Sequence, residues 1–126
     1  MCKGLGLDLC EVSRMEKLLK DDRFLSRFFT PEEALYVRSR GVGAASTLAG
    51  LFAAREALSK ALGSGLDFDL KEAEVCHTAD GAPYFRLSGR LKQRLAGCTP
   101  HLSISHDGGI AAAVVYLDIP DHSSGN

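Results

Sequence analysis

One stretch of the sequence, residues 53–63, carries polar side chains that could act on a phosphate ester. It reads AAREALSKALG, so Glu56, Ser59 and Lys60 stand at positions i, i+3 and i+4. On an α-helix this spacing puts all three side chains on one face. A carboxylate there can bind Mg²⁺, and an ammonium group one turn away can bind phosphate oxygens that the metal bridges. The alternative is an exposed Glu–Lys pair that only stabilises the helix.

A second carboxylate, Asp8, lies in a leucine-rich segment near the start of the chain. Leu5, Leu7 and Leu9 alternate with it, which predicts a β-strand over residues 4–10 with one buried face. A charge in such a strand needs a cation or another partner, unless it faces solvent from the exposed side of the sheet. Asp8 is therefore a candidate metal ligand, and a solvent-facing residue is the alternative.

Ser105, His106 and Asp107 have the residue types of a hydrolase triad, but their adjacency argues against one. They end a predicted strand, where successive side chains point to opposite faces. They therefore cannot form a proton relay with one another, and the chain contains no Gly-x-Ser-x-Gly elbow. His106 stays a candidate polar site residue, and an ordinary surface histidine is the alternative.

Basic side chains recur every three or four positions near the N-terminus: Arg14, Lys17, Lys20, Arg23 and Arg27. A continuous helix would gather them into one basic stripe, which could steer an acidic protein partner to the surface. The alternative is a solvated helix face, diluted by the acidic residues between them.

The composition indicates one ordinary globular domain. The chain has 126 residues with 15 Lys+Arg and 16 Asp+Glu, and we expect a domain over 1–118 and a frayed polar tail over 119–126. The net charge of −1 argues against a nucleic-acid partner. No apolar run approaches the roughly 20 residues of a membrane span, and Asp8 interrupts any signal peptide. We therefore expect a cytoplasmic protein without membrane contact. Its cysteines are scattered, which favours reduced thiols over a zinc site: Cys2, Cys10, Cys76 and Cys98.

Three helices are predicted before residues 53–63. Ser13 has the position of an N-cap, because Glu16 follows it by three residues. Residues 24–29 form a second, short helical segment. Thr30, followed by Pro31, predicts the start of a third helix that ends near residue 40.

The remaining elements follow from glycine positions and apolar patterning. The longest helix is predicted to begin at a Ser46 cap and to end before Gly63. Residues 69–78 and 83–87 predict a hairpin. A short helix over 89–96 and strands over 101–106 and 110–117 complete the chain, which gives an α+β fold class.

Five motifs appear in order along the chain: GLDL at 6–9, FFTPEE at 28–33, FAAREALSKALG at 52–63, GAP at 81–83 and SISHD at 103–107. In this order and spacing they resemble the holo-acyl-carrier-protein synthases, the short bacterial type of 4′-phosphopantetheinyl transferase. The resemblance covers about residues 4–117. It implies the phosphopantetheinyl-transferase fold, a small antiparallel sheet wrapped on a long central helix. It also implies a homotrimer with its sites between neighbouring subunits.

The resemblance implies an enzyme that transfers 4′-phosphopantetheine from coenzyme A to a serine of an apo acyl carrier protein. The reaction would depend on Mg²⁺ and release 3′,5′-ADP. Asp8 and Glu56 would be the metal ligands, and Glu56 would help to deprotonate the serine, directly or through a water. Lys60 and His106 would be the other catalytic residues. The residues that bind coenzyme A would be Ser59, Lys60, Gly81, Pro83 and His106.

The basic stripe matches the surface on which this family receives its acidic carrier protein. The residues expected there are Arg14, Met15, Lys17, Arg23, Phe24 and Arg27. Three positions depart from the family pattern: Leu51 replaces a common arginine, Arg55 a lysine and Ala82 a basic residue. These departures leave the phosphate contacts open, whereas the metal pair is intact.

Two other functions would use part of the same residues: a non-catalytic module that only docks a carrier protein, and a small nucleotide-binding regulator. The complete set of Asp8, Glu56, Lys60 and His106 argues against the first, and the basic stripe has no use in the second. The carrier could serve fatty-acid or polyketide synthesis, and the sequence favours neither.

Overall fold

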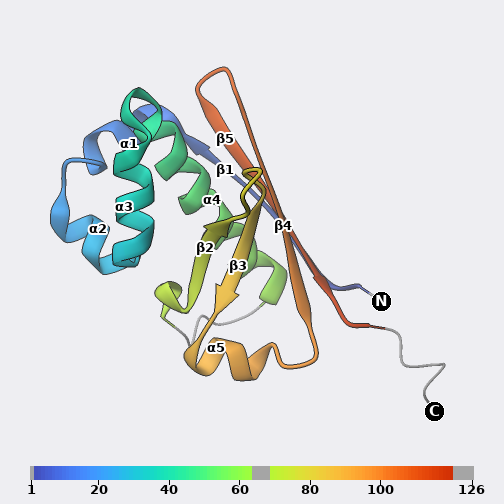
Figure 1. Ribbon diagram of the computed structural model, residues 1–126. Helices are drawn as coiled ribbons and strands as arrows, with labels where there is room; N and C mark the ends of the chain where they lie inside the picture. Colours follow the sequence, from blue (N-terminus) through green and yellow to red (C-terminus); the bar gives the residue numbers. More distant parts are fainter. Residues whose placement is uncertain (1, 64–68, 121–126) are drawn as a thin grey trace, which may run out of the picture.

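The computed structural model describes residues 2–63 and 69–120 and has the predicted α+β architecture (Figure 1). Most of the predicted tail, residues 121–126, lies outside the described residues. The elements are β1 (Cys2–Glu11), α1 (Val12–Leu18), α2 (Asp22–Phe28), α3 (Pro31–Ser39), the 3₁₀ turn η1 (Gly41–Gly43), α4 (Ala44–Leu62), the 3₁₀ turn η2 (Leu70–Glu72), β2 (Ala73–His77), β3 (Pro83–Leu87), α5 (Gly89–Arg94), β4 (Thr99–Asp107) and β5 (Ile110–Asp118).

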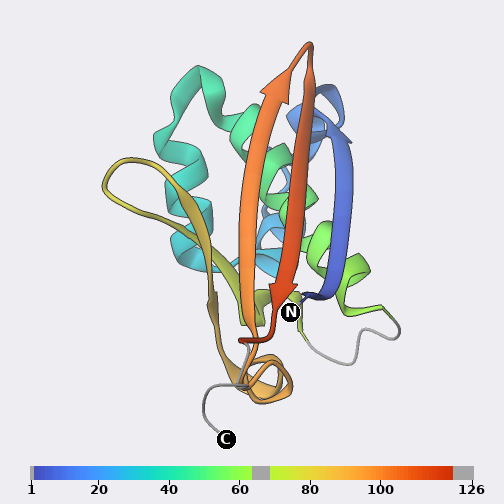
Figure 2. The same ribbon diagram turned by 90° about the vertical axis from the view of Figure 1, so that its right-hand side faces the viewer.

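A three-stranded antiparallel sheet in the order β1–β5–β4 forms one side of the molecule (Figure 2). Asp8 of β1 lies opposite Ala113 of β5, which in turn lies opposite Ile104 of β4. Strands β2 and β3 form a separate hairpin beside β4. Because β5 occupies the centre, β1 and β4 are the two edges of the larger sheet.

Helix α4 lies across one face of this sheet, and glycines let β1 touch it main chain to main chain (Figure 2). A Cβ on Gly4 would lie 2.0 Å from the carbonyl oxygen of Ala61, and one on Gly6 would lie 1.9 Å from that of Ala57. No other residue type permits such an approach. The glycines of β1 and the alanines of α4 thus bring Asp8 against the helix.

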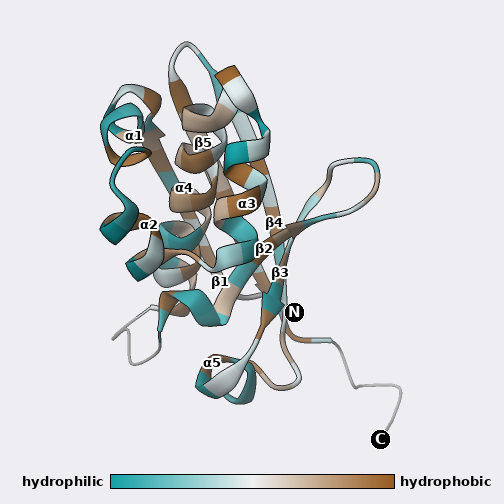
Figure 3. Cartoon of the chain, turned by 60° about the vertical axis from the view of Figure 1, so that its left-hand side comes forward, coloured by the Kyte–Doolittle hydropathy of each residue, from teal (hydrophilic) through white to brown (hydrophobic). Residues whose placement is uncertain are grey.

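The hydrophobic core lies between α4, the sheet and helices α1–α3. Leu48 and Leu58 of α4 pack there with Val115 and Leu117 of β5, all of them buried. Figure 3 shows α4 largely in hydrophobic colours and α5 largely in hydrophilic ones. The predicted sheet on a long central helix is therefore confirmed. None of the described helices has both the length and the apolarity that crossing a membrane requires.

Strand β1 is half buried, but the buried face is not the leucine face. Leu5, Leu7 and Leu9 are 58–64% exposed, whereas Gly6 and Cys10 face α4 and are buried. The prediction from hydropathy was wrong here because the helix backbone approaches too closely for leucine side chains. The leucines instead cover the outer face of the sheet.

The first backbone N–H of α1 donates to a carbonyl distant in sequence, and no serine caps the helix. Ser13 lies inside the helix, and Glu11 at the N-cap position makes no side-chain cap. The backbone N–H of Val12 donates to the carbonyl of Gly109 in the β4–β5 turn, 2.9 Å away. The predicted Ser13 cap is therefore wrong, because a tertiary contact takes its place.

The start of α3 is the predicted capping box. The Thr30 hydroxyl accepts from the backbone N–H of Glu33 at 3.1 Å, and the Glu33 carboxylate accepts from that of Thr30 at 2.9 Å. Helix α4 begins at Ala44 after η1, so Ser46 lies within it and does not cap it. Strand β2 is shorter than expected because residues 70–72 form a 3₁₀ turn instead.

Candidate functional site

The two predicted metal ligands lie where β1 crosses α4. The ammonium group of Lys60 donates to the carboxylate of Asp8 at 3.1 Å and to the carbonyl of Leu7 at 3.0 Å. The Asp8 side chain is 18% exposed and that of Lys60 58% exposed. Lys60 therefore pairs with Asp8 across the helix–strand contact, and not with Glu56 one turn earlier.

Glu56 is half-buried on the same face of α4. Within residues 2–63 and 69–120 its carboxylate makes no hydrogen bond or ion pair. The thiol of Cys10 lies near both carboxylates. Burial raises the pKa of Cys10 and the charge of Arg14 lowers it, whereas the negative charges of Asp8 and Glu56 raise it further. The two carboxylates thus share one neighbourhood, and Glu56 carries an unneutralised charge there.

This donor set suits a magnesium ion that also binds a phosphate ligand. Mg²⁺ is usually held by one or two carboxylates and keeps waters and substrate phosphates in its other positions. Asp8 and Glu56 supply that pair of carboxylates. Two carboxylates are all that the chain offers there: among the described residues, at this place as elsewhere, no group of three or more His, Cys, Asp or Glu is placed to hold a metal.

The neighbours of Glu56 in the sequence are used for structure. The Ser59 hydroxyl donates to the carbonyl of Arg55 at 3.0 Å, within the helix. Arg55 is buried, pairs with the buried Glu33 and donates through Nε to the carbonyl of Leu70 at 3.0 Å. Arg55 therefore faces the core. The arginine that stands here in place of the lysine of the family pattern adds no phosphate contact.

The other residues predicted to bind coenzyme A line a groove of about 270 Å³. Gly81 turns the β2–β3 hairpin with φ +93°, and Pro83 begins β3. The Nε2 atom of His106 lies 2.9 Å from the carbonyl oxygen of Ser46, so it carries a proton and donates it. A Cβ at Gly50 would lie 3.2 Å from this nitrogen, so glycine leaves room for the ring.

Sequence reasoning missed several residues of this groove: Tyr36, Arg40, Thr47 and His77. The Tyr36 and His77 rings stack with centroids 4.1 Å apart, and the Arg40 guanidinium lies 5.6 Å from the Tyr36 centroid. The spacing of Tyr36 and Arg40, four residues apart at the end of α3, was visible in the sequence. The contact of Tyr36 with His77, which lies 41 residues further along the chain, was not visible there.

The two groups of predicted residues lie at opposite edges of the sheet. Asp8 is on edge strand β1 and His106 on edge strand β4, with β5 between them. Two strand spacings separate such edges by about 10 Å. None of Asp8, Glu56 or Lys60 lines the groove of His106. The predicted site residues of one chain therefore fall into two separate groups, which we term half-sites.

The predicted carrier-docking residues lie on two short helices, α1 and α2, rather than on one continuous helix. Arg14, Lys17, Arg23 and Arg27 are exposed. Met15 is fully buried in the core, so its predicted contact with a carrier protein does not fit this structure. The Met15 side chain turns inward because it lies on the face of α1 that packs against α4.

Phenylalanine rings tie this surface to α4. Phe24 lies 5.1 Å from Phe28 and 6.5 Å from Phe52, centroid to centroid. The guanidinium of Arg14 lies 5.1 Å from the Phe52 centroid, and that of Arg27 lies 5.5 Å from the Phe28 centroid. Phe52 is one helical turn before Glu56, so the basic surface reaches the carboxylate pair.

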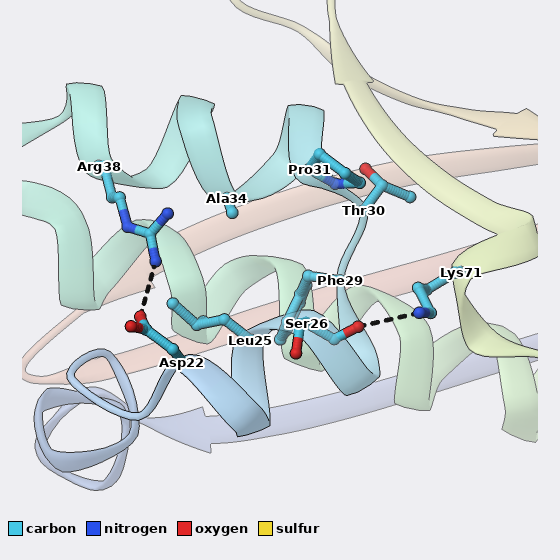
Figure 4. A pocket seen from close by; sticks show the side chains of 9 residues that line it. All are labelled: Asp22, Leu25, Ser26, Phe29, Thr30, Pro31, Ala34, Arg38 and Lys71. Carbon is cyan, nitrogen blue, oxygen red and sulfur yellow. Dashed lines mark hydrogen bonds and ion pairs between the residues drawn. The ribbon is translucent and has the colours of Figure 1, made fainter.

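A larger cavity of about 690 Å³ lies between α2, α3 and η2 (Figure 4). Its rim carries an ion pair of Arg38 with Asp22 at 3.1 Å, and Lys71 donates to the carbonyl of Ser26 at 2.9 Å. No predicted site residue lines it. Size alone therefore does not mark the candidate site in this fold.

Known proteins resemble the chain over nearly its full length. The 4′-phosphopantetheinyl transferase superfamily matches residues 4–115. A holo-[acyl-carrier-protein] synthase of Treponema denticola is 47% identical over 122 residues, which cover 94% of this chain and 99% of that protein.

Solved structures agree with these sequence matches. The holo-[acyl-carrier-protein] synthase of Neisseria meningitidis is 31% identical with a TM-score of 0.83 and covers 94% of this chain and 99% of its own. That of Helicobacter pylori, solved in complex with coenzyme A, is 32% identical with a TM-score of 0.78, over 90% of this chain and 99% of its own. The chain therefore belongs to the 4′-phosphopantetheinyl transferase superfamily, among its holo-[acyl-carrier-protein] synthases.

Proposed function

We propose that this protein transfers 4′-phosphopantetheine from coenzyme A to a serine of an acyl carrier protein and releases 3′,5′-ADP. The observation that carries the proposal is the Asp8, Glu56 and Lys60 cluster, which lies next to a basic, aromatic surface. An unneutralised carboxylate beside an exposed ammonium group suits a bound metal and a pyrophosphate. The adjoining surface suits an acidic protein that brings its own nucleophile.

Asp8 and Glu56 would hold Mg²⁺, which supplies charge neutralisation at the pyrophosphate when bound. Lys60 reaches the same place from the next turn of α4 and would bind a phosphate oxygen in place of its present partner, the Asp8 carboxylate. Glu56 would accept the proton of the incoming serine hydroxyl. The serine oxygen then attacks the β-phosphorus, the P–O bond to the 3′,5′-ADP moiety breaks, and that group leaves.

The carrier protein would dock on the surface formed by Arg14, Lys17, Arg23, Arg27 and the half-buried Phe24. Opposite charge steers such encounters and sets their orientation more than their final affinity. Because Phe52 belongs to both this surface and the helix of Glu56, a carrier bound there would present its serine close to the carboxylates.

We further propose that copies of the chain assemble, as a homotrimer, through the outer face of the sheet. Leu5 lies opposite Tyr116 and Leu7 opposite Val114, and all four are exposed. A contiguous exposed apolar patch of this kind is typical of an interaction surface. Assembly through this face would also let the His106 groove of one copy complete the Asp8 half-site of another.

The transfer is tested by incubating an apo acyl carrier protein with this protein, coenzyme A and Mg²⁺, and weighing the carrier by mass spectrometry. We expect a mass increase equal to one phosphopantetheine group. Glu56→Ala should abolish the increase while the circular dichroism spectrum stays unchanged. Glu32→Ala is the matched control, since this exposed glutamate of α3 does not line the groove of His106 and belongs to another helix than Glu56. No mass increase with any carrier would overturn the proposal, and full turnover by Glu56→Ala would overturn the metal assignment.

The shared site is tested by mixing two inactive variants. Asp8→Ala and His106→Ala each lack one half-site, so each should be inactive alone. Unfolded together and refolded as a mixture, they should regain activity, because mixed assemblies contain sites with both halves intact. A mixture no more active than its components would show that each chain uses only its own residues.

The docking surface is tested with Lys17→Glu and Arg23→Glu, which reverse two exposed charges. We expect a higher KM for the carrier and a weaker dependence of KM on salt. Lys92→Glu makes the same charge change on α5 and should leave KM unchanged. An unaltered KM in the first two variants would place the carrier elsewhere.

A further inference from the structure

The groove beside His106 contains one permanent positive charge that the family resemblance does not assign. Its walls come from α3, α4, the β2–β3 hairpin and β4, and Arg40 is the one lysine or arginine that lines it. Arg40 follows the last turn of α3, where its backbone N–H donates to the carbonyl of Val37 at 3.0 Å. Within the described part of the chain, no carboxylate pairs with the Arg40 guanidinium.

The guanidinium is held by aromatic stacking instead of by an acid. Arg40 lies over Tyr36, and the Tyr36 ring lies on His77 at an interplanar angle of 13°. A guanidinium over a ring keeps its N–H donors at the edge, where they can reach a planar or tetrahedral anion. The three groups thus form a platform, defined here as the Arg40 stack, that presents a cation without neutralising it.

The His77 ring adds no charge to the stack at neutral pH. Burial lowers the pKa of His77, and the charge of Arg40 lowers it further, whereas Glu33 raises it. The His77 imidazole is therefore neutral near pH 7, and the positive potential of the stack comes from Arg40 alone.

No other arginine or lysine is available at the positions where such a charge was expected. Leu51 lines the groove as a buried apolar residue. Ala82 brings no charge to the hairpin, and Arg55 is buried against Glu33. An anion bound in this groove would therefore meet Arg40, His106 or both.

We propose that Arg40 binds the 3′-phosphate monoester of coenzyme A in this groove and sets the preference for coenzyme A over its analogue without that phosphate. The proposal rests on the proposed function, since coenzyme A is the ligand it assigns to the groove. A phosphate monoester carries up to two negative charges and three acceptor oxygens, which matches an unpaired guanidinium. The stacked rings fix the side chain before the ligand arrives, so less entropy is lost on binding.

The inference is tested by titration calorimetry with 3′,5′-ADP and with 5′-AMP, which differ by the phosphate in question. Arg40→Gln should weaken the binding of 3′,5′-ADP about tenfold and that of 5′-AMP less than about twofold. Arg38→Gln is the matched control, because Arg38 lies on the same helix but pairs with Asp22 at another cavity. It should change neither affinity.

Two results would overturn the inference. One is an equal loss, or no loss, for both nucleotides in Arg40→Gln. The other is a wild-type protein that binds 5′-AMP as tightly as 3′,5′-ADP. In kinetics, Arg40→Gln should raise KM for coenzyme A about tenfold, with kcat and the KM of the dephosphorylated analogue nearly unchanged.

The same data separate this inference from the proposed function. A wild-type protein that binds 3′,5′-ADP through Arg40 but transfers nothing to any carrier would overturn the transferase proposal and leave the phosphate site standing. If wild type and Arg40→Gln both transfer phosphopantetheine with the same KM for coenzyme A, the transferase proposal stands and the phosphate site is overturned. Tyr36→Leu should reproduce part of the Arg40→Gln defect. Tyr36→Phe should bind 3′,5′-ADP as the wild type does, because phenylalanine keeps the stacking face.

Discussion

Helix α4 carries two ion pairs that differ in every respect except their charges. Arg55 and Glu33 are 2% and 0% exposed, and each makes further hydrogen bonds to backbone groups. Lys60 and Asp8 form a pair that opens to solvent, and Lys60 is 58% exposed. The buried pair is enclosed by the fold, and of its atoms only Nη1 of Arg55 lacks a hydrogen-bond partner within the described part of the chain. The exposed pair can exchange one partner for another.

This difference shows how one helix separates structure from chemistry. The Glu33 carboxylate accepts from Thr30, from Val75 and from Arg55, so it joins α3, β2 and α4 at one point. A charge bound in this way is costly to disturb and has no capacity left for a ligand. The pair of Lys60 contributes little to stability because water competes for it, which leaves both groups free for a substrate.

The largest effect on stability should come from breaking the buried pair. Arg55→Leu leaves the Glu33 carboxylate buried without its cation, and we expect a loss of about 3–5 kcal/mol in the free energy of unfolding, measured with urea. The double variant Arg55→Leu with Glu33→Leu should lose less than the single one, because no charge stays unpaired. If Arg55→Leu costs less than about 1 kcal/mol, the pair is not the link between these elements.

The next effect should come from the glycine contact that places the exposed pair. Gly6→Ala puts a methyl group against the carbonyl of Ala57, and we expect a loss of about 1–3 kcal/mol together with reduced transfer, because Asp8 moves away from α4. Gly43→Ala is the control, since Gly43 has φ −88° and open space around its Cα. It should change stability by less than about 0.5 kcal/mol. Equal stability of the two variants would contradict the close contact.

A smaller effect on stability, with a large effect on activity, is expected at the exposed pair itself. Lys60→Met should change the free energy of unfolding by less than about 1 kcal/mol. Phosphopantetheine transfer, measured on the same preparation, should fall about a hundredfold, because one donor to the phosphates is lost. A variant that is unstable but active would reverse the roles that the comparison gives to the two pairs.

The smallest effect is a pH dependence at the rim of the buried network. Burial alone would raise the pKa of Glu74, but hydrogen bonds from Thr30 and Arg86 lower it. A carboxylate with a lowered pKa stabilises the fold above its ordinary value, and that contribution is lost as the pH falls. Glu74→Gln should be less stable than wild type at neutral pH, and the difference should shrink between about pH 5 and pH 3. A constant difference over this range would contradict the assignment.

Local signals in the sequence predicted what local interactions decide. The capping box at Thr30 formed because both of its hydrogen bonds lie within one helical turn. The face shared by Glu56 and Lys60 follows from helical periodicity alone. The Ser13 cap failed because α1 begins one residue earlier, at Val12, whose backbone N–H donates to Gly109, nearly a hundred residues away.

The features that the sequence did not predict depend on contacts between segments distant in the chain. The actual partner of Lys60 is Asp8, which only the packing of β1 on α4 decides. The outward-facing leucines of β1 depend on that same packing. The Arg40 stack joins α3 to β2, and the residue types at these positions gave no sign of one another.

The contact of Gly4 and Gly6 with α4 has a consequence for motion. Because main-chain atoms make it, no side-chain rotamer can loosen it, and β1 and α4 must move as one body on the nanosecond timescale of rotamer exchange. The distance between the Asp8 and Glu56 backbones is then fixed by main-chain packing rather than by side-chain fluctuation. Any change that opens this site has to carry the strand and the helix together.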